Sequence, residues 1–136
     1  AIQLNDANHT IITGKTSELL GASSALLLNA LKHLAGIADD VRMISPTVLE
    51  PVCKLKTGAL GHRNPRLHTD EVLVALSICA ITDENAQKAL DKLPELKNCE
   101  VHTSVILSQT DERVFRRLGV NLTQEAKYQT SKLYHQ

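Results

Sequence analysis

The chain has 136 residues, enough for one domain with a buried core, and 43% of them are hydrophobic, as in ordinary globular proteins. Its 15 basic residues balance 15 acidic ones, and only 2% of the chain is aromatic. The chain therefore lacks the net positive charge and the aromatic side chains with which proteins commonly bind nucleic acid. No apolar run approaches the length needed to span a membrane. We therefore expect neither nucleic acid nor a membrane as a partner.

The three cysteines, Cys53, Cys79 and Cys99, are widely and irregularly spaced. Because no CxxC pair exists, the pattern does not predict a zinc site. We interpret these residues as small buried hydrophobes in a reducing cytosol. The chain opens with AIQLND, which has neither a methionine nor a charged leader, so we expect no signal peptide and a piece of something longer.

The first part of the chain is predicted to form a β-hairpin followed by a long helix. Ile2 and Leu4 alternate with polar neighbours, and an Asn/Asp-rich turn separates them from a second apolar pair. From Ser17 to Ala35 the leucines recur at helical spacing, and Gly36 supplies a stop. Because the apolar stripe is wide and small residues are frequent, we expect this helix to be buried between layers or at an interface.

A second helix is predicted after a short extended piece at Val41–Ile44. Ser45 and Pro46 are typical of the cap and first residue of a helix, which should reach about Lys56. Pro51 lies inside this segment and removes one backbone hydrogen bond, so we expect a kink or a late start.

Two further helices are predicted beyond a loop at Thr57–Leu67. Thr69 is expected to cap the third helix, since acidic residues follow it in the first turn. The fourth helix should run from about Asp83 to Leu93 and end at Pro94.

The last third of the chain is predicted to contain two strands around a short helix. Residues alternate over Glu100–Ser108, a helix is expected at Asp111–Leu118 with Gly119 as its stop, and a last strand at Asn121–Tyr128. The order ββαααα-βαβ predicts an α+β fold, a two-layer domain with an N-terminal β-hairpin and four to five helices on a small mixed sheet. We expect residues 1–136 to form a single domain.

The letters Gly14-Lys15-Thr16 match the end of a phosphate-binding P-loop, but the rest of that motif is missing. A P-loop needs another glycine five residues earlier, where this chain has His9 at the start of a predicted strand. We interpret the stretch as a strand–turn–helix junction in which Thr16 or Ser17 caps the helix. Because a helix N-terminus can still hold an anion, Lys15 and Thr16 remain candidate anion-binding residues.

A longer basic stretch, CKLKTGALGHRNPRLHTDE, is the stronger candidate for an anion site. Lysines, arginines and histidines occur between Glu50 and Asp70 without any acidic residue. Arginine forks, a glycine-rich turn and helix amides together suit a phosphate or carboxylate. The alternative is a solvated loop whose cations pair with acids elsewhere in the fold. The candidate residues are Arg63, Asn64, Arg66, His68 and Thr69.

The sequence indicates no catalytic residues and no metal. The histidines of the basic stretch are not at metal-ligand spacing with any cysteine, and HTDE is not an HExxH helix. An enzyme that uses His68 with Asp70 is the least favoured hypothesis, because both residues flank a helix start and nothing shows that they converge on a pocket.

Four long stretches resemble one bacterial family, and the resemblance covers nearly the whole chain. They read KTSELLGASSALLLNALKHLAGI, ISPTVLEPVCKLK, NPRLHTDEVLVALSICAIT and CEVHTSVILSQTDERVFRRLGVNLTQEAKY. They closely resemble the C-terminal part of the family classed as domain of unknown function 1846. The resemblance implies a cytoplasmic protein considerably longer than this chain, with an N-terminal α/β nucleotide-binding domain that carries a Pro-Gly-Ser-Gly-Lys loop. It also implies nucleotide binding or ATP hydrolysis by the full-length protein, and homo-oligomeric assembly.

We therefore expect an accessory and assembly domain that contacts the protein's own N-terminal domain or a second copy. In this hypothesis the segment holds no cofactor of its own, and ATP belongs to the full-length protein. The alternative is a non-catalytic regulatory module that binds a phosphorylated small molecule through the basic loop.

Overall fold

The computed structural model describes residues 1–126, and its elements follow the expected order. The strands are β1 (Ile2–Gln3), β2 (Ile11–Ile12), β3 (Glu100–Thr103) and β4 (Asn121–Gln124). The helices are α1 (Ala22–Ala35), α2 (Pro46–Thr57), α3 (Thr69–Cys79), α4 (Glu84–Leu90) and α5 (Gln109–Arg117), with a 3-10 turn η1 (Leu93–Leu96) after α4. The predicted α+β class is therefore confirmed.

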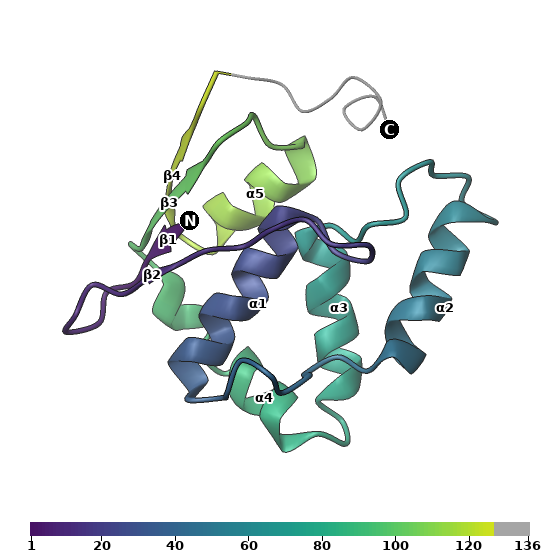
Figure 1. The fold of residues 1–136 in the computed structure, drawn as a ribbon, viewed down its shortest axis with the longest axis horizontal. Coiled ribbons are helices and arrows are strands. Elements are labelled where there is room, and N and C mark those ends of the chain that lie inside the picture. Colours follow the sequence, from purple (N-terminus) through teal and green to yellow (C-terminus); the bar gives the residue numbers. More distant parts are fainter. Residues whose placement is uncertain (127–136) are drawn as a thin grey trace.

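The strands form one mixed sheet in the order β2-β1-β3-β4. β1 is antiparallel to both of its neighbours, so Ile2 lies opposite Ile12 on one side and Val101 on the other. β3 and β4 are parallel, and α5 makes the crossover between them. Figure 1 shows the sheet along one side of the molecule and the helices gathered on the other. The predicted hairpin and the mixed sheet are both confirmed.

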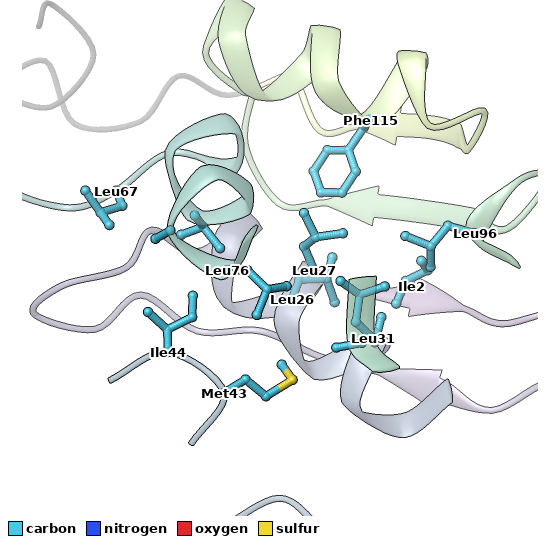
Figure 2. Packing of buried hydrophobic residues seen from close by; sticks show 14 of the residues in the cluster. Ile2, Leu26, Leu27, Leu31, Met43, Ile44, Leu67, Leu76, Leu96 and Phe115 are labelled. Carbon is cyan, nitrogen blue, oxygen red and sulfur yellow. The ribbon is translucent and has the colours of Figure 1, made fainter. Parts of the chain in front are cut away.

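One aliphatic core fills the space between the sheet and the helices. Ile2 and Val101 enter it from the sheet, Leu27 and Leu31 from α1, and all are almost fully buried. Figure 2 shows Phe115 of α5 reaching toward Leu27 in the middle of this core. Because burying such a side chain is worth about 1.5–3 kcal/mol, α1 contributes much of the driving force for folding. The leucine-rich face of α1 is thus buried within its own domain, whereas Asn29 and His33 on the other side remain exposed.

All three cysteines are buried and unpaired, which confirms their interpretation as small hydrophobes. Burial raises the pKa of the Cys53 and Cys99 thiols, so both are less prone to ionise than an exposed cysteine.

The start of α1 was predicted wrongly. The helix begins at Ala22, with Gly21 as its N-cap, five residues later than the predicted Ser17. In between, the Ser17 amide donates to the Leu20 carbonyl to close a bend, and Leu20 then forms a bridge with Leu67 of the loop before α3, where the Leu67 amide donates to the Leu19 carbonyl over 2.8 Å. Backbone groups committed to that partner cannot also join a helix. Neither Thr16 nor Ser17 therefore caps α1, whereas the predicted stop at Gly36 is confirmed by its left-handed backbone, with φ of 71°.

Gly14 lies directly against the backbone of α1. A Cβ atom at this position would stand 2.7 Å from the Ala22 carbonyl oxygen and 2.6 Å from the Leu26 Cα. The glycine of the Gly-Lys-Thr stretch is therefore required by a close approach of two backbones.

The expectations for the middle of the chain are confirmed only in part. Val41–Ile44 forms no strand, although Met43 and Ile44 are buried and pack into the core. α2 begins at Pro46 as predicted, so Pro51 does not delay its start. The third helix is capped by His68 and not by Thr69, which is its first residue and is fully buried.

The fourth helix is shorter than predicted, because it ends at Leu90. The chain then turns, and Pro94 lies inside η1 where the predicted helix should have stopped. α5 begins at Gln109, two residues before the predicted Asp111.

Both C-terminal strands are also shorter than predicted. β3 ends at Thr103, and the next turn is closed by the Thr103 hydroxyl donating to the Val105 carbonyl over 2.7 Å. β4 ends at Gln124, whose side-chain oxygen accepts the Leu107 amide over 2.6 Å. The Gln124 side chain thus accepts the Leu107 amide, which would otherwise be free to bond to the backbone of a longer neighbouring strand. Residues 127 and 128 of the predicted last strand lie outside the described residues.

The contact at Gly14 predicts a specific loss of stability. Gly14→Ala should lower the free energy of unfolding by about 1–3 kcal/mol, because the new methyl group meets rigid backbone and forces the segment away from α1. Urea denaturation followed by circular dichroism measures this change. Gly21→Ala is the matched control, since a Cβ there lies 3.7 Å from its nearest neighbour, and it should cost less than about 1 kcal/mol. Equal losses in the two variants would contradict the explanation.

Candidate functional site

The two stretches that the sequence marks as possible anion sites lie against each other. Leu20 and Leu67 form a parallel bridge, in which the Gly21 amide donates to the Leu67 carbonyl over 3.3 Å. The Ser24 hydroxyl donates to the same carbonyl over 2.7 Å. Figure 1 shows the segment after β2 running past α1 to the loop that leads into α3. We call the surface formed by segments 13–21 and 62–69 the loop junction.

Arg66 connects the two segments of the loop junction. Its Nε donates to the Ser17 carbonyl over 2.6 Å, and its backbone amide donates to the Asn64 side chain over 3.0 Å. Arg66 is half-buried, and its terminal guanidinium nitrogens have no hydrogen-bond partner in the part of the chain that the structure describes. Arg66 therefore both holds the junction together and keeps donors for an external group.

Lys56 belongs to the basic stretch but points inward. Its buried Nζ donates to the Glu71 carboxylate over 2.9 Å and to the backbone carbonyl of Arg66. Glu71 also accepts the amide of His68 over 2.9 Å. A buried ammonium is tolerated only when it is paired in this way. Lys56 is therefore a structural residue that supports the junction from beneath.

The amino end of α3 already holds a carboxylate, which comes from Asp111 of α5. Its Oδ1 accepts the backbone amide of Thr69 over 3.0 Å and the Thr69 hydroxyl over 2.8 Å. Its Oδ2 lies 3.6 Å from Nδ1 of His68. An anion at a helix N-terminus is favoured by the free amides and the helix dipole. Thr69 and His68 thus direct polar atoms toward an internal anion that the sequence analysis did not identify.

The pKa values of this pair are shifted in opposite directions. The nearby Asp111 carboxylate raises the pKa of His68 above its ordinary value, against the opposing effect of burial. Burial alone would raise the pKa of Asp111, but the His68 imidazole and the two Thr69 donors outweigh it and hold that pKa below its ordinary value. The interaction therefore favours a charged pair at the start of α3.

The remaining candidates face solvent. Arg63 is exposed in the loop before α3, and Lys15 and Thr16 are exposed just ahead of Ser17. Glu18, also exposed, adds one negative charge to the same segment. The loop junction therefore presents Lys15, Arg63 and the half-buried Arg66 as its cationic side chains.

The arginine side chains of the loop junction have the chemistry to bind an anion. Arginine forks can grip a phosphate or carboxylate through paired charge-assisted hydrogen bonds. Within residues 1–126, no three His, Cys, Asp or Glu side chains gather as metal ligands. A shallow depression does occur on the surface, but it lies beside α5, where its lining is Gln109, Glu112, Arg113, Arg116 and Arg117.

Comparison with known proteins agrees with the resemblance in the sequence. Residues 1–134 match the family described as "Domain of unknown function DUF1846, C-terminal". The chain belongs to this family. It is 60% identical over 134 residues to the UPF0371 protein DIP2346 of Corynebacterium diphtheriae, covering 98% of this chain and 27% of that relative. The UPF0371 protein CD630_08980 of Clostridioides difficile is 48% identical over 135 residues, covering 99% of this chain and 26% of that relative.

The chain therefore spans about a quarter of the length of the curated relatives it matches. These relatives are bacterial proteins. None of the described helices is both long enough and apolar enough to cross a membrane.

The shifted pair at α3 predicts that stability depends on pH. Because the pKa of His68 is raised, its contribution is complete below the ordinary value of 6.5 and is lost as the pH rises through the folded-state pKa. Because the pKa of Asp111 is lowered, its contribution is complete above the ordinary value of 3.8 and is lost as the pH falls through the folded-state pKa. The His68–Asp111 pair should therefore stabilise the fold most between pH 3.8 and pH 6.5.

Thermal unfolding at about pH 5.5 and about pH 8.5 measures the upper edge of this window. Between the lower and the higher pH, the free energy of unfolding should fall by about 0.5 kcal/mol more in the unmodified chain than in His68→Gln. The effect is small because the imidazole is one-third exposed and is screened by solvent. His68→Gln removes the titrating group, so an equal loss in both proteins would mean that the pair does not set this dependence.

Proposed function

We propose that this domain is the C-terminal accessory and assembly domain of a longer cytoplasmic bacterial protein that binds nucleotide. In this proposal ATP hydrolysis belongs to the part of the full-length protein outside this chain, and the loop junction adds positive charge beside the bound phosphates. The observation that carries the proposal is the pairing of Leu20 with Leu67, which brings the segment that carries Lys15 against the basic loop.

The chemistry of the junction supports a role in holding an anion. The Arg66 guanidinium is already oriented by its bond to the Ser17 carbonyl, so little freedom is lost when its remaining donors engage a ligand. Arg63 is exposed and can reach a ligand held by another part of the protein. A site assembled from two domains would also explain why the junction is an open surface in this domain.

A regulatory module is the second candidate, and it depends on the same surface. In that case the junction would bind a phosphorylated small molecule without contributing to nucleotide binding. Calorimetry separates the two possibilities, because a regulatory site should favour a sugar phosphate over ATP or ADP.

The proposal predicts that arginines of the junction strengthen nucleotide binding in the full-length protein. Arg63→Ala and Arg66→Ala should each weaken the affinity for ATP roughly tenfold or more, because each removes a charge-assisted hydrogen bond. Isothermal titration calorimetry measures the effect, with Lys88→Ala on the exposed surface of α4 as the unaffected control. Arg63 is the cleaner test, since Arg66 also supports the fold.

Two outcomes would contradict this assignment. Unchanged affinity in both arginine variants would remove the junction from the nucleotide site. A loss in Lys15→Ala without one in Arg66→Ala would show that the Gly-Lys-Thr stretch and not the basic loop supplies the contact.

Homo-oligomeric assembly is part of the same proposal. Full-length protein should elute as a single species larger than a monomer, and light scattering coupled to gel filtration gives its mass. A strictly monomeric species at high protein concentration would exclude this part of the proposal.

A further inference from the structure

Helix α3 has an unusually apolar composition beyond its first turn, which carries Asp70 and Glu71. No charged residue occurs between Glu71 and Asp83, so the whole helix after its first turn consists of aliphatic and small residues. A helix on a protein surface normally carries charged residues on its solvent side, whereas one that is apolar all round is buried. With 11 residues, α3 is too short to span a membrane, so its composition predicts burial in protein.

Only one face of α3 is buried within this domain. The inner face carries Val72, Ala75, Leu76 and Cys79, and α3 packs against α1, α4 and α5, with a smaller contact to α2. The opposite face leaves Val74 at 60%, Ile78 at 47% and Ile81 at 81% of full exposure. These three residues are spaced i, i+4 and i+7, so they form one line along the helix and its last turn, which we call the outer stripe.

The outer stripe differs from the rest of the described surface. Six large hydrophobic residues are exposed, and half of them lie on this single stripe while Ile11, Leu55 and Leu60 belong to other elements. The short helix α5 shows the ordinary pattern, because its outer face carries Glu112, Arg113, Arg116 and Arg117. Single exposed aliphatic residues need no explanation, but a contiguous set on a helix that carries no charge beyond its first turn marks a contact surface.

We propose that the outer stripe docks against the part of the full-length polypeptide that lies outside this chain. That part accounts for about three quarters of each relative, since the matched region covers 27% and 26% of two of them. This inference rests on the proposed accessory role, and it names the surface through which the domain would contact the rest of its own protein.

Size argues for this occupant over a second copy of the domain. A stable interface between separate molecules buries roughly 800 Å² on each partner, which three aliphatic side chains on one helix do not approach. A covalently linked partner is present at high effective concentration, so a smaller apolar contact is sufficient to hold it. The stripe therefore matches an interface within one polypeptide.

Cysteine labelling of the full-length protein tests the proposal. Val74→Cys and Ile81→Cys place thiols at two ends of the outer stripe, and Lys88→Cys on the exposed face of α4 is the control. Modification by a maleimide is followed at each position by peptide mass spectrometry, which separates the new thiols from native cysteines. The two stripe positions should react at least about tenfold more slowly than Lys88→Cys, because modification requires the contact to open.

The dependence on concentration identifies the occupant. Protection that is unchanged when the protein is diluted supports docking within one polypeptide. Protection that disappears on dilution assigns the stripe to a second copy and overturns the proposal, as does labelling at the control rate. The labelling rate reports the burial of the outer stripe and needs no ligand. The docking proposal can therefore fail while the nucleotide-binding role of the loop junction holds, and the nucleotide-binding role can fail while docking holds.

Discussion

The arrangement of this domain depends on how the backbone of Leu67 is held in the core. The residue is fully buried although it lies in the loop between α2 and α3. Its amide donates to Leu19, and its carbonyl accepts from Gly21 and from the Ser24 hydroxyl. Because buried backbone groups without partners are costly, these three bonds are what allow a loop to enter the interior. They also determine where α1 and α3 begin, since both helices start just beyond the pairing.

Acidic residues from the helices neutralise the basic loop from within. Glu71 pairs with Lys56, and Asp111 lies beside His68 at the start of α3. The positive charge that the basic stretch presents at the surface is therefore smaller than its composition suggests, and it is carried by Lys54, Arg63 and the half-buried Arg66. The solvated-loop interpretation and the anion-site interpretation thus apply to different residues of one segment: inward-facing cations are paired, and outward-facing ones are open to a ligand.

Features with a local cause could be predicted from the sequence, and features with a distant cause could not. Gly36 ends α1 and Ser45 precedes α2 because both effects act within one helical turn. The start of α1 and the length of β3 depend instead on Leu67 and Gln124, which lie far away in the chain. The candidate site divides in the same way. Charge patterning predicted the basic loop, whereas its contact with segment 13–21, the burial of Lys56 and the role of Asp111 required the fold.

The position of β1 has a consequence for the order in which the domain folds. This strand lies inside the sheet, and its closest partners include β3, so Ala1 and His102 are bonded across 101 positions of the chain. Contacts over such a separation carry a large loop-closure cost and form slowly, whereas helical turns form from neighbours. During synthesis the helices can therefore form early, while the centre of the sheet stays incomplete until the residues of β3 have left the ribosome.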